Sequence, residues 1–313
     1  MRAVAVKELG AGPEVTDVVR PEPVGNEVLV RVEAAGLNPL DWRIADGMLK
    51  GTRAYTFPMT MGVDFAGYVE DTGPDARRFR IGDPVYGQVV DPGRGGTYAE
   101  YVVVPDDGAI APSPSSVPHD VSAGVPTAGM TARGIVGAAA LREYESVLVV
   151  GAAGGVGTFL TQLAAAHGLR VVAATHGNDQ RRMGTFGAAL TVNSREHPLT
   201  ERVRDEYPGG VDALVDLASG PEEFAAHARL VRNGGVAVST RFAADPEALY
   251  AAGVEGINFS LDASAELLDA LAREIDSGAL IVPVEARVPL DEAPDAVARN
   301  RSGGARGKTV ITL

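Results

Sequence analysis

The stretch Glu145-Ser-Val-Leu-Val-Val-Gly-Ala-Ala-Gly-Gly-Val-Gly157 runs from an apolar strand directly into a cluster of glycines. An apolar helical segment follows, and after it comes a second strand, Arg170-Val-Val-Ala-Ala-Thr175. A strand, a glycine turn and a helix in this order place a pyrophosphate at the N-terminus of the helix, where backbone N–H groups and the helix dipole attract anions. The stretch therefore predicts a dinucleotide-binding site.

The glycines of this loop have different tasks. Gly151 permits the tight turn, Gly154 lets the backbone approach the phosphates, and Gly157 lets the helix pack closely on the strand. An ordinary turn is the alternative for a glycine cluster taken alone, but the flanking strands and helix favour the nucleotide loop. We expect the following residues to contact the cofactor: Gly151, Ala152, Gly154, Gly155, Val156 and Gly157.

The end of the second strand bears on which nucleotide is bound. Chains that select NAD place Asp or Glu there, to accept a hydrogen bond from the ribose 2′-hydroxyl. This strand ends in Thr175, His176, Gly177 and Asn178, and Arg181 and Arg182 follow. A guanidinium group suits the geometry of a 2′-phosphate. We therefore expect NADPH, with NADH less favoured, and contacts from Thr175, His176 and Arg181; the alternative is that both arginines are solvated helix residues.

The composition limits the possible functions. A net charge of −13 argues against nucleic acid or an anionic membrane surface as a partner. The chain has no cysteine, which excludes disulfides, thiolate catalysis and thiolate metal sites. No apolar run approaches the length of a membrane span, and residues 1–6 alternate like a strand, unlike a signal peptide. A cytoplasmic location is the expectation.

With 313 residues, the chain is long enough for two domains. Residues 1 to about 115 are β-rich: short strands at 28–33, 64–70, 83–88 and 97–104 are separated by Gly and Pro, as in a partly closed barrel. Residues 105–118 have the composition of a linker.

Beyond that segment, helices alternate with strands, which predicts an α/β fold with a doubly wound parallel sheet. The predicted strands are 146–150, 170–175, 211–216, 234–239 and 254–259, and a helix at 263–276 closes the domain. Strands at 284–288 and 308–313, with a short helix near 291–300, have no place in that sheet, so we expect them to return to the first domain. The predicted domains are 1–118 with 283–313, and 119–282.

Several motifs occur in an order that covers nearly the whole chain. They are Ala34-Ala-Gly-Leu-Asn-Pro-Leu-Asp-Trp42, Met61-Gly-Val-Asp-Phe-Ala-Gly-Tyr-Val-Glu70, Gly95-Gly-Thr-Tyr-Ala-Glu-Tyr101, Val125-Pro-Thr-Ala-Gly-Met-Thr-Ala132, the 151–157 loop and Gly307-Lys-Thr-Val-Ile-Thr-Leu313. In these motifs the chain resembles the medium-chain dehydrogenase/reductase superfamily, in particular its zinc-free quinone oxidoreductase branch. The resemblance implies a GroES-like β-barrel domain, a Rossmann domain, a cleft between them for nicotinamide and substrate, and a homodimer.

Zinc-dependent members of that superfamily hold the metal with a Cys and a His of the first domain. Here the matching places read Asn38 and, near the second, Asp64, and all five histidines (119, 167, 176, 197 and 227) lie at or beyond the predicted linker. A catalytic zinc site cannot be assembled from these residues, so we expect no metal. What remains is hydride delivery to an electron-poor acceptor, either a quinone or the β-carbon of a conjugated carbonyl.

Without a metal, hydrogen-bond donors must stabilise the charge that develops on the acceptor oxygen. The first candidate is the Asn38-Pro-Leu-Asp41 turn, in which the Asn38 amide can donate to substrate or cofactor and Asp41 can orient that amide or the neighbouring loop. The alternative is that both residues only form the turn. Some similar family members use a Tyr of the next loop as proton donor, but this segment reads Asp46-Gly-Met-Leu49. Tyr55 could substitute for it, unless it is a packing residue.

By the same resemblance, Thr131 lies near the nicotinamide, and Asn258 and Phe259 flank its ring. The predicted function is that of a zinc-independent NADPH:quinone oxidoreductase. The alternatives are an NADPH-dependent reductase of α,β-unsaturated carbonyls or enoyl thioesters, and a non-catalytic NADPH-binding sensor.

Overall fold

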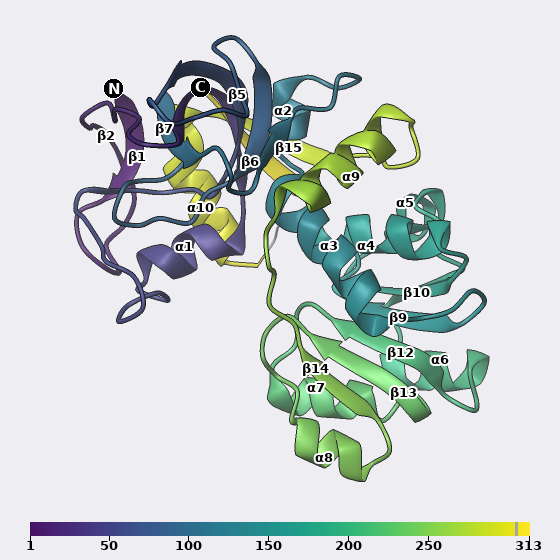
Figure 1. Cartoon of the computed structure of the whole chain (residues 1–313). Helices are drawn as coiled ribbons and strands as arrows, with labels where there is room; N and C mark the ends of the chain where they lie inside the picture. Colours follow the sequence, from purple (N-terminus) through teal and green to yellow (C-terminus); the bar gives the residue numbers. More distant parts are fainter. Residues whose placement is uncertain (304–305) are drawn as a thin grey trace. The chain divides into compact units, whose positions relative to one another are not determined.

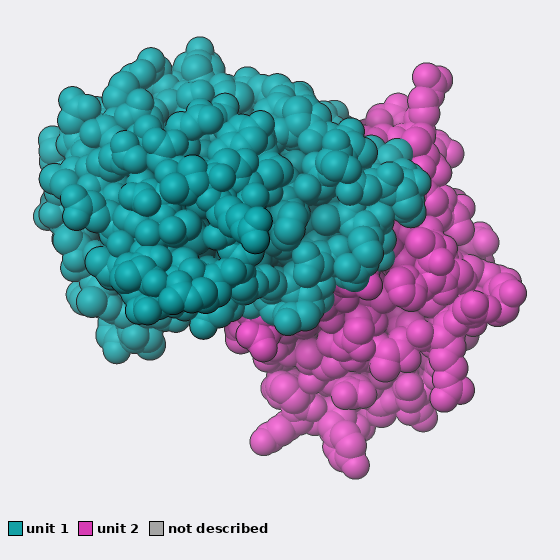
Figure 2. Space-filling model, turned by 45° about the horizontal axis from the view of Figure 1, so that its top comes forward, with its two compact units in different colours: residues 1–130, 263–313 teal, residues 131–262 magenta. Residues whose placement is uncertain are grey.

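A computed structural model of the chain describes residues 1–303 and 306–313, which form two compact units (Figure 2). Unit 1 contains Met1–Met130 and Ala263–Leu313, and unit 2 contains Thr131–Asp262. The divisions differ from the predicted ones at 118/119 and 282/283. At the second division, helix α9 (Ala265–Asp276) packs against strand β8 (Ile110–Pro112), and the Tyr86 hydroxyl donates a 2.6 Å hydrogen bond to Leu268 O of this helix. These contacts hold α9 on unit 1.

Unit 2 is built on a six-stranded sheet in the order β11-β10-β9-β12-β13-β14, with every neighbouring pair parallel (Figure 1). This confirms the predicted doubly wound α/β sheet. The strand order reverses between β9 and β12, the place where open α/β sheets bind ligands at the carboxyl ends of their strands. The strands are β9 (Ser146–Val150), β10 (Arg170–Thr175), β11 (Leu190–Asn193), β12 (Val211–Asp216), β13 (Val231–Ser239) and β14 (Glu255–Asn258).

The following helices alternate with the strands of this sheet along the chain. The first of them, α3, crosses the division between the units, so its first residues belong to unit 1. The helices are α3 (Pro126–Ala139), α4 (Gly155–Ala166), α5 (Gln180–Thr185), α6 (Leu199–Glu206), α7 (Pro221–Ala228) and α8 (Pro246–Ala251).

Unit 1 contains a seven-stranded sheet in the order β15-β16-β3-β5-β6-β8, with β7 also paired to β3, and a three-stranded sheet β2-β1-β4. The prediction that the tail returns to the first domain is confirmed, because β16 pairs antiparallel with β3. The strands are β1 (Arg2–Val6), β2 (Glu14–Asp17), β3 (Glu27–Leu37), β4 (Met59–Thr60), β5 (Asp64–Thr72), β6 (Pro84–Gln88), β7 (Tyr101–Pro105), β8, β15 (Val284–Pro289) and β16 (Lys308–Thr312).

The predicted linker at 105–118 is wrong over part of its length. Strand β8 lies within it and pairs with β6, and Ile110 is fully buried. Just before the strand, the Asp106 carboxylate accepts hydrogen bonds from the backbone N–H groups of Arg77 and Arg78. The many Pro, Ser and Asp residues of this segment are typical of a linker, and a strand with only two buried residues adds little apolar signal.

Four short helical segments complete unit 1: α1 (Pro39–Ala45), α2 (His119–Ser122), a 3₁₀ turn (Leu290–Glu292) and α10 (Ala293–Arg301). Asn38 is the N-cap of α1, and Pro39 at its first position has the backbone angle that a helix start needs. The indole N–H of Trp42 donates to Asn300 Oδ1 at 3.1 Å and joins α1 to α10. Across the described part of the chain, no helix has both the length and the apolar character that a membrane span requires.

The attachment of α9 to unit 1 can be tested with Tyr86→Phe. The change deletes one buried hydrogen bond and keeps the ring, so we expect the free energy of unfolding to fall by about 1 kcal/mol. Urea titration of the variant measures this. Tyr250→Phe is the matched control, because Tyr250 is 83% exposed, and it should leave stability unchanged; equal effects from the two variants would contradict the assignment.

Candidate active site

Asn38 lies at the centre of a buried polar network in unit 1. Its Nδ2 donates to Asp64 Oδ2 at 2.8 Å and to Gly36 O at 3.3 Å, and its Oδ1 accepts from Lys308 Nζ at 2.6 Å. The residue is 4% exposed. Both amide hydrogens and the amide oxygen are therefore used by the protein itself.

Lys308 opens strand β16 and is buried with its charge compensated. Its ammonium group donates to Asn38 Oδ1 and to Leu37 O at 3.1 Å, and lies 3.8 Å from Asp64 Oδ2. An ammonium group has three donors, and here three acceptors surround it. Burial lowers the pKa of Lys308, and the carboxylates of Asp64 and Asp41 oppose that shift. Two hydrogen bonds and the nearby Asp64 carboxylate favour the charged form.

Asp64, the first residue of β5, is the counter-charge of Lys308. Besides the Asn38 amide, its carboxylate accepts hydrogen bonds from the Thr127 backbone N–H at 3.1 Å and from the Thr127 hydroxyl. Burial raises the pKa of Asp64, whereas Lys308 and these hydrogen bonds lower it. Because every donor points at the carboxylate and an ammonium lies beside it, we describe the pair as ionised.

Asp41 occupies the third helical position of α1, next to this pair. Its Oδ2 accepts a 2.6 Å hydrogen bond from the Asn38 backbone N–H and another from the Tyr98 hydroxyl. Burial raises the pKa of Asp41 to about 7, although these two donors oppose the shift. Burial and the neighbouring carboxyl group of Asp41 hold the pKa of Tyr98 well above its usual value.

The three predicted catalytic residues differ in how their polar atoms are hydrogen-bonded within the protein. The structure brings Asn38 and Asp41 together, and Asp41 accepts a hydrogen bond from the backbone of the turn. Donation from the Asn38 amide to a substrate stays a prediction; in this structure both of its hydrogens are used within the protein. The Tyr55 hydroxyl donates to Ile44 O at 2.9 Å and accepts from Leu49 N at 3.1 Å. Tyr55 therefore fastens its own loop.

Sequence reasoning missed three members of the network. These members are Lys308, Tyr98 and Thr127. All three lie within the motifs that carry the family resemblance, but sequence reasoning assigned them no role. One signal was present: Lys occurs only at positions 7, 50 and 308, so a lysine among the apolar residues of the last strand stands out among arginines.

The places of the zinc ligands do not fit a zinc ion here. Asn38 Oδ1 and Asp64 Oδ2 face the ammonium of Lys308, and a second cation beside them would be repelled. Within residues 1–303 and 306–313, no three or more His, Cys, Asp or Glu side chains gather in a group able to hold a metal.

In unit 2, the residues of the glycine loop fit a dinucleotide. Gly151 has φ +81°, which favours glycine, and a Cβ on Gly157 would lie 2.4 Å from Gly151 O. Helix α4 starts at Gly155 without a side-chain cap, so the first N–H groups of the helix are left for a ligand. A Cβ at Gly154 would approach only Gly151 O, so this side of the loop is open.

The residues after β10 divide into buried and exposed ones. Thr175 is buried, and its hydroxyl donates to Gly177 O at 2.9 Å, so it shapes the turn. His176 is exposed, with Nδ1 2.9 Å from Ser194 Oγ. Arg181 is exposed and lines a hollow of about 560 Å³ with Asn178 and Gln180. His176 and Arg181 are therefore placed where a phosphate group could reach them.

The other predicted cofactor residues lie further along the fold. Thr131 is half-buried on α3. The Asn258 side chain closes the loop after β13, accepting from Ala244 N at 3.1 Å and donating to Ala244 O at 3.0 Å. Phe259 packs against α3, since a Cβ at Gly134 would lie 2.7 Å from its ring. Their contacts with a cofactor stay predictions.

A GroES-like unit and a Rossmann unit with a nucleotide-fitting loop define an oxidoreductase of the medium-chain type. Residues 25–115 match the family model "Alcohol dehydrogenase GroES-like domain", and residues 186–311 match "Zinc-binding dehydrogenase". The mouse quinone oxidoreductase is 31% identical over all of this chain and 98% of its own length. The chain belongs to the medium-chain dehydrogenase/reductase superfamily, together with its quinone oxidoreductases.

Two solved structures carry the same fold. One, described as an NAD-dependent alcohol dehydrogenase, is 29% identical with a TM-score of 0.88, and all of each chain is covered. The other, a mycobacterial protein complexed with NADPH, is 27% identical with a TM-score of 0.87, again over all of each chain. The protein is therefore an oxidoreductase of the nicotinamide-dependent type, and these two likenesses point to different nucleotides.

The nucleotide loop can be tested with Gly157→Ala. The new methyl group would overlap the backbone of Gly151 and Ala152, so we expect a loss of about 1–3 kcal/mol in stability and at least tenfold weaker NADPH binding, measured by urea titration and by cofactor fluorescence. Gly137→Ala is the control, since nothing lies within 4 Å of a Cβ there; it should bind NADPH normally. Normal binding by Gly157→Ala would count against this loop.

The buried ion pair predicts a strong coupling between two substitutions. Lys308→Met leaves the Asp64 carboxylate buried without its counter-charge, which we expect to cost about 3–5 kcal/mol of stability. Asp64→Asn in the same chain removes the orphaned charge and should restore a large part of that loss. Chemical denaturation of both single variants and the double variant measures the coupling; additive losses would show that the two groups do not act as a pair.

Proposed function

We propose that this protein is a zinc-independent oxidoreductase that uses NADPH to reduce a quinone. The observation that carries the zinc-independent part is the Lys308 ammonium, which lies between Asn38 Oδ1 and Asp64 Oδ2, at the two places that correspond to metal ligands in zinc-dependent relatives. The quinone as acceptor is supported by the similarity to the mouse quinone oxidoreductase over the full chain.

The chain's own residues supply the cofactor site of this proposal. The N–H groups at the start of α4, from Gly155 to Gly157, hold the pyrophosphate. His176 and Arg181 hold the 2′-phosphate, and the absence of an acidic residue at the tip of β10 supports NADPH over NADH. A bound reduced nicotinamide supplies hydride. Thr131, Asn258 and Phe259 complete the nicotinamide side in the proposal.

The assembly we propose is a homodimer. In the sheet of unit 2, β14 is an edge strand that pairs only with β13 among the described strands, so its other edge offers free backbone groups to a second copy. Sedimentation at several protein concentrations measures the oligomeric state, and a monomer at all of them would contradict the proposal. The cytoplasm is the proposed location.

The acceptor is tested by steady-state oxidation of NADPH against a panel of quinones, enals, enones and enoyl thioesters. Turnover with quinones supports the proposal. Turnover with conjugated carbonyls alone would replace it with the alkene reductase, and tight NADPH binding without turnover would replace it with the sensor.

The nucleotide preference is tested with Arg181→Ala. The variant lacks the exposed guanidinium of Arg181 and therefore its charged hydrogen bond to the 2′-phosphate, a group that NADH does not have. We expect the Kd for NADPH to rise at least tenfold, while the Kd for NADH changes less than twofold. Fluorescence titration with both nucleotides measures this. Arg204→Ala, an exposed arginine on α6, is the control and should alter neither value. An unchanged preference in Arg181→Ala would exclude this arginine from the phosphate site.

A further inference from the structure

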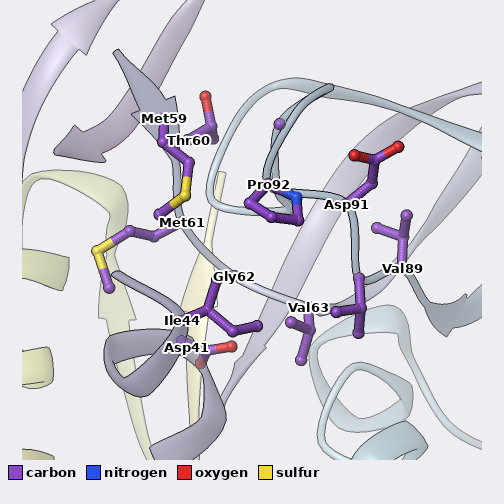
Figure 3. Close-up of a pocket in the computed structure, with 13 residues that line it drawn as sticks. Asp41, Ile44, Met59, Thr60, Met61, Gly62, Val63, Val89, Asp91 and Pro92 are labelled. Atoms are coloured by element: carbon purple, nitrogen blue, oxygen red, sulfur yellow. The ribbon is translucent and has the colours of Figure 1, made fainter. Parts of the chain in front are cut away.

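The small cavity that Asp41 lines in unit 1 has mainly apolar walls, which include the side chains of Ile44, Met59, Met61 and Val89 (Figure 3). Its volume is about 20 Å³, which is room for about one water molecule and far below the size of a pocket that binds an organic ligand. This cavity is therefore no site for a cofactor or acceptor ring. Unit 2, in contrast, exposes an aromatic side chain in the loop that follows strand β13.

That side chain is Phe242, and it combines two features that do not stabilise the fold. Its backbone φ is +57°, in the left-handed region, which is strained for a bulky residue. Its side chain is 61% exposed, so most of the apolar ring stays in contact with water. Strained residues of this kind cluster at binding sites, where the surrounding structure holds them in place. We therefore expect the ring to be kept available for a ligand.

The residues around Phe242 hold it in this conformation. Ser239 Oγ accepts hydrogen bonds from two backbone N–H groups of the loop, one on each side of Phe242 and both at 3.1 Å. Ala243 and Ala244 are buried in the core of unit 2, and the Asn258 amide makes two hydrogen bonds to the backbone of Ala244. The ring is thus presented on a fixed loop, so little entropy is lost in ordering it when a ligand binds.

Phe242 also belongs to the edge of the sheet that carries the cofactor loop. Strand β13 runs parallel to β12, and the Thr240 N–H, just after β13, donates to Asp216 O at the end of β12 at 3.3 Å (Figure 1). The loop after β12 in turn contacts the glycine loop, since a Cβ on Gly151 would lie 3.4 Å from the Cβ of Ala218. The loops after β9, β12 and β13 therefore form one continuous row at the carboxyl ends of the strands.

The direction of a dinucleotide along this row follows from the strand order. In sheets of this type the adenosine ribose lies at the end of the strand that corresponds to β10, and the pyrophosphate lies at the end of the one that corresponds to β9. The other half of the dinucleotide then extends the opposite way, toward the ends of β12 and β13. Two strand spacings amount to about 10 Å. The nicotinamide half is thereby directed toward the loop that holds Phe242.

We propose that Phe242 is a binding residue for the nicotinamide half of NADPH and that its phenyl ring packs against the flat nicotinamide ring. This rests on the cofactor of the function proposed above. Two flat rings attract each other by stacking, and the contact removes apolar surface of both from water. The exposed ring gains this contact only when the cofactor is bound, which is why it adds nothing to the stability of the free protein.

The test is Phe242→Asn, followed by calorimetric titration with NADPH and with adenosine 2′,5′-bisphosphate, which has the phosphates but no nicotinamide. The Kd for NADPH should rise about two- to tenfold, the range that ring stacking contributes. The Kd for the bisphosphate should stay unchanged. Asn adopts the left-handed region more readily than Phe. The urea midpoint of unfolding should therefore not fall, although a phenyl ring has been removed.

Tyr144→Asn is the matched control. Tyr144 has φ +71° and is 74% exposed, so the same change is made to an exposed aromatic residue in the same backbone region. It lies two residues before β9, at the amino end of the sheet and opposite the cofactor loop. The control should leave both Kd values unchanged; weaker NADPH binding in Tyr144→Asn equal to that in Phe242→Asn would contradict the proposal.

Several outcomes would overturn the role of Phe242 and leave the proposed function standing. They are an unchanged Kd for NADPH, equal weakening of NADPH and the bisphosphate, and a fall in the urea midpoint. A raised KM for quinone with an unchanged Kd for NADPH would assign the ring to the acceptor instead, and a loss of self-association with that same Kd would assign it to a second copy of the chain.

The proposed function can fail separately. Wild-type protein that binds NADPH but reduces no acceptor would overturn the function, and the binding role of Phe242 would still be decided by the two titrations. Wild-type protein that binds no nicotinamide nucleotide would overturn both.

Discussion

The buried ion pair of Lys308 and Asp64 is the interaction on which the site in unit 1 depends. Each charge would be costly alone, and the pair is tolerable because the surrounding donors and acceptors are all used. The pair also joins distant parts of the chain: Lys308 opens the last strand, and Asp64 opens the central strand β5. Its geometry thus requires that the tail return to the first unit, as β16 does beside β3.

The same pair explains how the site is divided between Asn38 and Asp41. Asn38 lies between the ammonium of Lys308 and the carboxylate of Asp64. Its amide accepts a hydrogen bond from the first and donates one to the second, and so orients both groups. Its backbone N–H, together with Tyr98, holds one oxygen of Asp41, and the other oxygen is buried without a hydrogen-bond partner among the described residues. The Asn38 amide, predicted to donate to a substrate, is engaged within the protein in this structure, and Asp41 has one oxygen without a hydrogen-bond partner among the described residues.

Much of the fold could be predicted because its signals are local. The apolar run into Gly151, the alternation of strands and helices after residue 145 and the unpaired tail strands each depend on neighbouring residues, and the six parallel strands follow from them. Strand β8 was missed because Pro, Ser and Asp dominate its surroundings. The position of α9 was missed because the hydrogen bond from Tyr86 to Leu268 spans 182 residues.

The network in unit 1 is hidden from sequence reasoning for the same physical reason. Its bonds join residues 26, 57, 63 and 270 positions apart, and no periodicity connects them. The cofactor loop predicted in unit 2, in contrast, consists of backbone groups whose requirement for glycine is visible in seven consecutive residues. A site built from backbone needs special residues at fixed spacing, whereas a site built from side chains needs only that the fold bring suitable groups together. For that reason the sequence predicts the cofactor loop from local residues, whereas only the three-dimensional structure shows that one carboxyl oxygen of Asp41 lacks a partner among the described residues.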